Sequence, residues 1–206
     1  MSPIGAARAA KPWMRIFDCL APVAANTARM AKADGFDGVA RYVETLTEGE
    51  IQGIFAAGLA LVPLSEGVTG MELTAALGKS IEEARVEKLV EFGCPGGVSF
   101  WTDHEDPKVG SDSVGYLTAR ANVKIGAGFR ACLYGGMPMD LTGIQLYRLP
   151  FTGYWRGGGA VPEPTCGWQI YQAPPLNQMM SWGQLVDVNF TMGDYKGRYP
   201  VLWYPE

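Results

Sequence analysis

The chain has 206 residues, of which 48% are hydrophobic and 18% charged, and its formal net charge is −4. These values are typical of one globular domain large enough to bury a sizeable core. The acidic balance, without any cluster of lysine or arginine, excludes a surface built to neutralise phosphates, so we expect no nucleic-acid partner.

The first two thirds of the chain predict strands alternating with helices. Strands are expected at 14–19, 38–43, 59–67, 98–105 and 130–136, and helices at 25–34, 47–58, 71–92, 113–125 and 139–148. Asn26 or Thr27 is expected to cap the first helix, and Thr47 followed by Glu50 has the capping-box spacing at the second. This alternation predicts a parallel sheet with right-handed crossovers.

The last third contains three more expected strands, at 152–159, 167–172 and 185–190, with little helix between them. Eight strands favour closure, so we predict an α/β fold, a single (β/α)8 TIM-type barrel with degenerate helices in the C-terminal third. One domain is expected over residues 1–206, with its core at about 14–190. An open doubly wound sheet is the alternative, although neither a dinucleotide-binding G-x-G-x-x-G nor a P-loop is present.

The cysteines and the N-terminus bear on cofactors and location. The four cysteines are widely separated and form no C-x-x-C pair, so we expect reduced thiols, no metal and no cofactor, with a structural disulfide as the alternative. The N-terminal sequence MSPIGAARAAKPW lacks the apolar segment of a signal peptide, and no run reaches the ~20 apolar residues of a membrane span. We therefore expect a protein made in the cytoplasm that does not insert into a membrane.

Acidic residues recur at the ends of the expected strands. In a barrel of this type, catalytic residues lie at the carboxyl ends of the strands, where they share one rim. Charged residues are seldom buried without a partner or a purpose. We therefore predict a functional site formed by Asp18, Glu66, Asp103, Glu105 and Asp187.

The run from Trp101 to Glu105 gives the sharpest prediction. Alternation along a strand directs Asp103 and Glu105 to the side of Trp101 and directs His104 to the other side, where it would hydrogen-bond behind the site. Two carboxylates at i and i+2 lie about 6–7 Å apart at Cα, and their repulsion raises one pKa. A protonated carboxyl beside an ionised one is the pair that glycoside hydrolysis uses. The alternative interpretation is that D-x-E merely ends a strand and solvates a loop.

Several segments in the same order resemble a known family. They are Asp18 after the first strand, the D-x-E of the fourth, Tyr134-Gly135, Trp168-Gln169 and the last-strand run Val186-Asp187-Val188-Asn189. Their order resembles the glycoside hydrolase family 25 lysozymes and a related domain of unknown function termed glycoside-hydrolase-like. The segments GFDGVARYV, LTEGEIQGIFAAGLALVPL and WQIYQ also resemble the latter group, and the resemblance runs from about Arg15 to Phe190.

The resemblance implies roles for individual residues. Glu105 would be the general acid, and Asp103 would stabilise the oxocarbenium-like transition state or position the attacking group. Asp18 and Asp187 would bind sugar or orient this pair. Glu66 joins them as a substrate-binding acid, and the groove would be lined by Tyr134, Trp155 and Gln169.

The function implied is muramidase-like hydrolysis of bacterial cell-wall peptidoglycan. By analogy with a phage endolysin or virion component, the protein would act at the cell wall after release or within a phage particle, where other virion proteins would be partners. A catalytically inactive glycan-binding or structural module is the alternative, favoured by the aromatic-rich C-terminal third, in which Trp155 and Trp168 are the preferred sugar-binding rings. A weaker alternative is a phosphate-binding loop at Arg156 and the three glycines that follow it.

Overall fold

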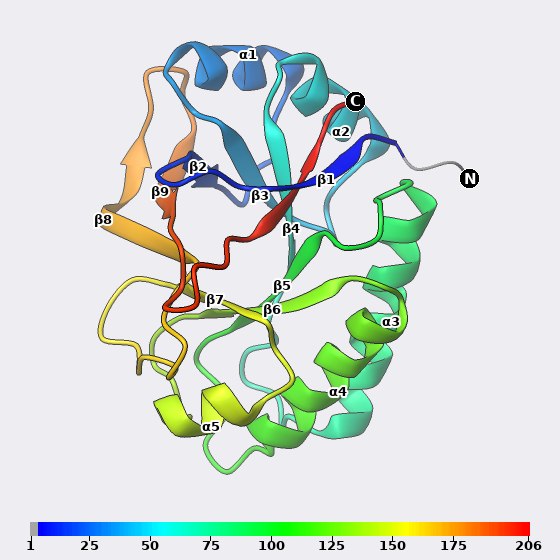
Figure 1. Cartoon of the computed structure of the whole chain (residues 1–206), viewed down its shortest axis with the longest axis vertical. Coiled ribbons are helices and arrows are strands. Elements are labelled where there is room, and N and C mark those ends of the chain that lie inside the picture. Colours follow the sequence, from blue (N-terminus) through cyan, green and yellow to red (C-terminus); the bar gives the residue numbers. More distant parts are fainter. Residues whose placement is uncertain (1–3) are drawn as a thin grey trace.

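Eight strands pair in chain order into a closed ring in the computed structural model, which describes residues 4–206 (Figure 1). The pairing of β4 with β5 and of β9 with β2 completes the ring, so the sheet is a barrel and not an open doubly wound sheet. The ring strands are β2 (Arg15–Asp18), β3 (Gly38–Tyr42), β4 (Ala60–Ser65), β5 (Ser99–His104), β6 (Arg130–Gly135), β7 (Gly153–Arg156), β8 (Ile170–Met179) and β9 (Leu185–Thr191). The predicted TIM-type barrel is confirmed.

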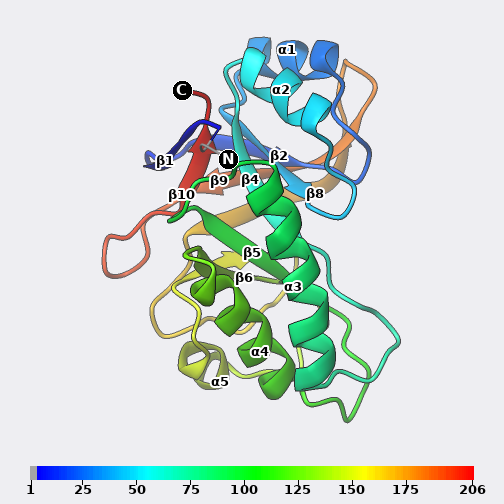
Figure 2. The same cartoon turned by 90° about the vertical axis from the view of Figure 1, so that its right-hand side faces the viewer.

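Five helices follow the first five ring strands and cover the outside of the barrel. They are α1 (Ala25–Ala33), α2 (Glu48–Ala56), α3 (Ala75–Glu91), α4 (Ser113–Gly126) and α5 (Gly143–Arg148). Figure 2 shows α1 beside α2, and α3 beside α4. No helix follows β7 or β8 in the described part of the chain, which agrees with the degenerate helices predicted for the C-terminal third. None of the helices between residues 4 and 206 is long and apolar enough to span a membrane.

Strand alternation divides the buried side chains into two layers. Outward residues such as Phe17, Val39 and Leu61 belong to a cluster that includes Ile51 and Ile54 of α2. Inward residues fill the barrel and leave no channel through it, and they include Ile16, Ala40, Val62, Trp101, Cys132 and Ile170. All four cysteines are buried and free.

The last ring strand, β9, runs antiparallel to both of its neighbours, which corrects the expectation of a wholly parallel sheet. β8 and β9 form a long hairpin, and a hairpin needs no helical crossover. Because β9 is reversed, its first residues, and not its last, lie at the carboxyl ends of the parallel strands. Asp187, near the start of this strand, pairs with Asp18 at the end of β2. Asp187 therefore reaches the carboxyl ends of the parallel strands.

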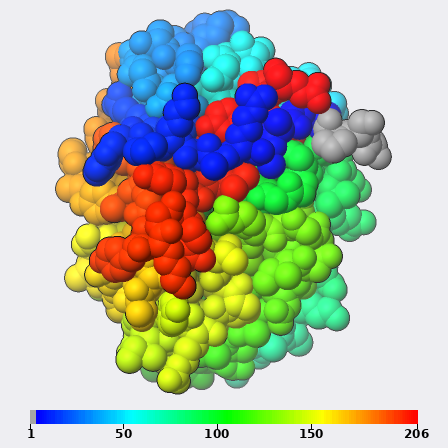
Figure 3. Space-filling view, in the orientation of Figure 1, coloured from blue at the N-terminus to red at the C-terminus, as the bar shows by residue number. Residues whose placement is uncertain are grey.

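A two-stranded ribbon at the termini was not predicted. β1 (Ala6–Ala9) pairs antiparallel with β10 (Val201–Tyr204), and β10 meets β4 at a single position. Figure 3 shows the N-terminal segment, in blue, lying against the C-terminal segment, in red. Leu202 packs with the inward residues Ile16 and Ala60, so the ribbon covers the amino-terminal end of the barrel.

The predicted helix caps are confirmed at α2 and wrong at α1. Thr47 Oγ1 accepts a hydrogen bond from the Glu50 amide at 3.2 Å, as an N-cap does. The Glu50 carboxyl turns instead to Arg41, at 2.6 Å, so the reciprocal half of the capping box is missing. Neither Asn26 nor Thr27 caps α1, since the N-cap is Ala24, which makes no side-chain hydrogen bond.

Candidate active site

A cavity of about 510 Å³ opens at the carboxyl ends of the barrel strands. Its walls are mainly the last inward-facing residues of the strands and the first residues of the loops that follow. No lysine or arginine lines it, whereas three carboxylic acids do. The polar and aromatic lining residues are Asp18, Tyr42, Glu105, Tyr134, Trp155, Gln172, Asn177 and Asp187.

Glu105 follows β5 directly and presents its carboxyl group to this cavity. Burial, followed by the nearby charges of Asp106 and Asp187, raises the pKa of the Glu105 carboxyl. Among the described residues, no group donates a hydrogen bond to this carboxyl, which leaves it free to meet a ligand. Gly136 packs against it so closely that a Cβ atom there would lie 2.8 Å from the Cβ of Glu105.

Asp103 lies in β5, two residues before Glu105 and deeper in the barrel, and 4% of its surface is exposed. Burial and then the charge of Glu105 raise the pKa of Asp103 to about 7, although the Tyr42 hydroxyl donates a hydrogen bond to its Oδ2 at 3.1 Å. Its other oxygen is buried and accepts no hydrogen bond from the described residues. Asp103 therefore forms part of the floor beneath the cavity and does not line it.

Asp18 is held by a chain of side chains across the barrel. Trp155 Nε1 donates to Asn189 Oδ1 at 3.0 Å, and Asn189 Nδ2 donates to Asp18 Oδ2 at 2.6 Å. Because the amide of Asn189 is fixed from both sides, its orientation is determined by the network. Burial raises the pKa of Asp18 to about 7 against the effect of this hydrogen bond, with Asp187 the largest charge that adds to the rise.

Asp187 accepts hydrogen bonds at both of its oxygens. Gln172 Nε2 donates to Oδ2 at 2.7 Å, and the backbone amide of Asn177 donates to Oδ1. Gln172 Oε1 in turn accepts from the Tyr134 hydroxyl at 3.1 Å and from the Gly158 amide at 2.6 Å. Glu105, Asp18 and Asp187 thus converge on one mouth, and Asp103 lies beneath it.

Besides Asp103, two predicted site residues lie outside the cavity. Glu66 is exposed beyond the end of β4 and does not line it, because the loop after β4 carries its side chain outward. Gln169 is fully buried near the start of β8, where its Nε2 lies 3.3 Å from Asp194 Oδ2. It precedes the strand instead of ending it, so it cannot reach the carboxyl-terminal mouth.

The other residues singled out in the sequence are also placed. His104 points outward, and its Nε2 lies 3.0 Å from Asp140 Oδ1, so the expectation that it hydrogen-bonds behind the acids is confirmed. The amides of Gly157 and Gly158 are engaged by Gly135 O and Gln172 Oε1. Most of the donors that a phosphate-binding loop would use are therefore occupied, and the phosphate interpretation is wrong.

Tyr42, Gln172 and Asn189 were missed as site residues. Each lies inside or at the end of a strand that the sequence did predict, and the sequence carried the signal for each. Asn189 is two residues after Asp187, and alternation places both on the inward face. The prediction from strand ends considered only charged residues, and these three residues are neutral hydrogen-bonding groups that contact the acids.

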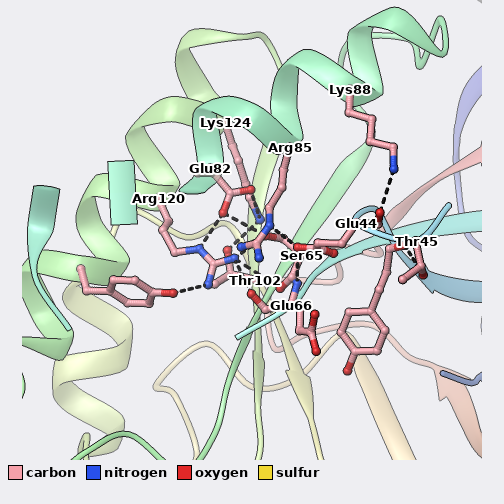
Figure 4. A network of polar contacts seen from close by, with 12 residues as sticks. Glu44, Thr45, Ser65, Glu66, Glu82, Arg85, Lys88, Thr102, Arg120 and Lys124 are labelled. Atoms are coloured by element: carbon pink, nitrogen blue, oxygen red, sulfur yellow. Dashed lines mark hydrogen bonds and ion pairs between the residues drawn. The ribbon is translucent and has the colours of Figure 1, made fainter. Parts of the chain in front are cut away.

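A buried ionic cluster supports β4 and β5 from outside the barrel (Figure 4). Glu82 of α3 lies 2.6 Å from Arg120 Nε and 3.4 Å from Lys124 Nζ of α4, and all three side chains are fully buried. Arg120 also donates to the carbonyl of Glu66 at 3.2 Å, and Lys124 donates to Thr102 Oγ1 at 2.7 Å. Burial lowers the pKa of Lys124 to about 7. The cluster therefore holds the end of β4 and the residue of β5 that precedes Asp103.

The acids of the described site are not arranged as a metal-binding cluster. Among the residues that the structure describes, no group of three or more His, Cys, Asp or Glu side chains could hold a metal ion. What remains is a set of carboxyl groups in a concave site with aromatic walls. Carboxyl groups with raised pKa values can donate protons near neutral pH, and ionised ones stabilise positive charge.

No protein-family model and no curated protein matches the chain, whereas solved structures do. An uncharacterized protein of B. stearothermophilus matches with a TM-score of 0.71 and 15% identity, covering 87% of this chain and 96% of that one. A Tat-secreted protein of Mycobacterium tuberculosis matches with a TM-score of 0.68 and 16% identity, covering 91% and 98%. The catalytic domain of an endolysin from bacteriophage P40 of Listeria monocytogenes matches with a TM-score of 0.59 and 14% identity, covering 89% and 95%.

The similar structures also include a second endolysin, a muramidase, and an autolysin of Streptococcus pneumoniae that was solved in complex with a synthetic peptidoglycan ligand. All of these likenesses fall below 20% identity, so they concern the fold. The chain therefore shares its barrel with endolysins, an autolysin and a muramidase, and also with an uncharacterized protein and a Tat-secreted protein.

Proposed function

We propose that this protein is a glycoside hydrolase that cleaves the glycan of bacterial cell-wall peptidoglycan. The observation that carries the proposal is the convergence of Glu105, Asp18 and Asp187 on one mouth that no lysine or arginine lines, with Asp103 buried beneath it. Glycosidic bond cleavage needs a proton donor at the leaving oxygen and negative charge near the oxocarbenium-like transition state. This mouth offers both.

Glu105 is the proposed general acid. Its carboxyl faces the cavity, its pKa is raised, and no described group competes for its proton. Asp187, whose two oxygens accept hydrogen bonds, lines the same cavity and is suited to contact the sugar. Burial raises the pKa of Asp103 and of Asp18 to about 7, so ionising either one adds negative charge at the mouth or directly beneath it.

Peptidoglycan is the proposed substrate because of the names of several proteins with this fold, one of which was solved with a peptidoglycan ligand. The structures that share this barrel include endolysins, a muramidase, and an autolysin in complex with a synthetic peptidoglycan ligand. Together with the resemblance of the D-x-E and the strand-end acids to family 25 lysozymes, they support a muramidase-like reaction. Action at the cell wall after release, or from within a phage particle, belongs to the same proposal.

One observation favours a second candidate, a barrel that binds glycan without cutting it. Asp103 lies below the cavity with 4% exposure, so a bound sugar would meet it only if the floor opened. Incubating the protein with purified insoluble peptidoglycan separates the two candidates, with bound protein and newly formed reducing ends measured in parallel. New reducing ends support the hydrolase, binding without them supports the silent barrel, and failure to bind contradicts both.

A further inference from the structure

A second aromatic cavity, of about 530 Å³, lies on the outer wall of the barrel. It occupies the side where β7 and β8 lack a covering helix. It is lined by Trp13, Arg156, Val161, Glu163, Trp168, Tyr171 and Met192. On the face drawn in Figure 3, the red and orange C-terminal segment lies between the blue N-terminal segment and the yellow region around residue 160. Segments far apart in the chain thus build this wall together.

Trp13 is the notable residue of this cavity, since its side chain is 71% exposed although its backbone is strained. Its φ of 61° lies in the left-handed region, which a bulky residue seldom adopts. Hydrogen bonds to Thr191 fix the segment on both sides: the Trp13 amide donates to Thr191 O at 2.8 Å, and the Met14 amide donates to Thr191 Oγ1 at 3.0 Å. Strain of this kind persists where the surroundings enforce it, and functional sites are where it clusters.

The outer cavity and the acidic mouth lie on opposite faces of the same two strands. In β7, Trp155 faces the mouth and Arg156 faces outward, and in β8, Gln172 faces the mouth and Tyr171 faces outward. A small cavity of about 180 Å³ lies between them at the strand ends. It shares Gly158, Gly159, Gln172 and Leu176 with the mouth, and Arg156 and Tyr171 with the outer cavity.

The three glycines after Arg156 line this small cavity. Gly157, Gly158 and Gly159 have no side chains, so neighbouring side chains pack directly against the backbone of the rim between the two larger cavities. A Cβ atom on Gly158 would lie 2.5 Å from Leu176, and one on Gly159 would lie 2.9 Å from Met137. Leu176 and Met137 therefore occupy the space above Gly158 and Gly159, and glycine at these positions lets them pack against the rim.

We propose that the outer cavity binds further sugar units of the same polymer whose cleaved bond lies in the mouth. This inference rests on the proposed function. Trp13 and Tyr171 offer flat apolar faces with polar edges, which suit the C–H faces and hydroxyl groups of a sugar. Arg156, stacked over Tyr171 at 5.3 Å, provides donors, and Glu163 provides an acceptor at the cavity edge. The small cavity shares lining residues with both larger ones, so a polymer that extends beyond the mouth would meet the outer cavity next.

The test uses protein carrying Glu105→Gln, so that the polymer is bound and not cut, with purified insoluble peptidoglycan as the probe. Trp13→Gly in this background removes the ring while relieving the strained φ, because glycine adopts this conformation freely. We expect binding to weaken by about 10-fold, which corresponds to about 1.4 kcal/mol. Tyr171→Ala is the second variant and is expected to weaken binding in the same direction.

The matched control is Tyr147→Ala, which removes a half-exposed aromatic ring of α5 outside all three cavities and is expected to alter binding by no more than about twofold. Unchanged affinity in both the Trp13 and the Tyr171 variants would overturn this inference alone, whereas absence of binding by the parent would overturn the proposed function with it. The comparison is repeated on glycan strands freed of their peptides. A Trp13 effect that disappears on these strands would mean that the cavity takes peptide and would also overturn the inference.

Discussion

Replacing Asp103 with asparagine should stabilise the protein above neutral pH. The carboxyl has 4% exposure, one hydrogen bond from Tyr42 and one oxygen without a partner. Burial raises the pKa of Asp103 from 3.8 to about 7. At about 1.4 kcal/mol for each pH unit between these values, the ionised group costs the folded state about 4 kcal/mol. Asparagine keeps the shape and stays neutral, so it avoids this cost.

The sign of the pH dependence follows from the same values. Below pH 4 the Asp103 carboxyl is protonated in both the folded and the unfolded chain, and it costs nothing. Between pH 4 and pH 7 the unfolded chain loses this proton while the folded chain keeps it, so the free energy of unfolding of the wild type falls. Above pH 7 the loss levels off. The Asp103→Asn variant lacks this contribution throughout.

Urea unfolding of the two proteins from pH 4 to pH 8.5 measures the effect. We expect the difference in the free energy of unfolding to grow in favour of Asp103→Asn by about 4 kcal/mol over this range. Glu72→Gln, which removes an exposed acid before α3, should instead follow the wild type at every pH. Parallel curves for wild type and Asp103→Asn would refute the reasoning that burial retains the proton.

Three further predictions concern the support of the site. Glu82→Gln leaves the buried Arg120 guanidinium without its counter-charge and should cost about 3–5 kcal/mol in urea unfolding, whereas an unchanged midpoint would show that this ion pair adds no net stability. Gly78→Ala places a Cβ 2.5 Å from Tyr116 O where α3 meets α4, so despite the better helix propensity of alanine it should cost about 1–3 kcal/mol and lower the Tm; a higher Tm would contradict this packing. Asn189→Leu removes the donor to Asp18 and should raise the pKa of that carboxyl further in an NMR titration; a fall would contradict the network.

The barrel was predictable because its strands and helices carry strong local signals. The strand 98–105 and the helix 113–125 each match an element to within a residue or two, since apolar runs and glycine stops mark their limits. The terminal ribbon was missed because Ala6–Ala9 has no alternation of large apolar residues. Its stability comes from pairing with a segment almost 200 residues away, which no local pattern encodes.

The candidate site was predictable where a charge ends a parallel strand. Asp18 and Glu105 were found by this rule, and Glu66 was included by it although its loop carries it outward. Asp187 was included for an incorrect reason, because it lies near the start of a strand that runs the opposite way. The direction of β9 depends on the hairpin with β8, which is a property of the whole sheet.

Glu105→Gln tests the central claim most directly. The change keeps the size of the side chain and removes its proton, so the rate at which purified peptidoglycan is solubilised should fall by about 10²–10⁴-fold. Glu66→Gln, at the same rim but outside the cavity, should solubilise it at close to the wild-type rate. Equal rates for wild type and Glu105→Gln would contradict the assignment of Glu105 as the proton donor.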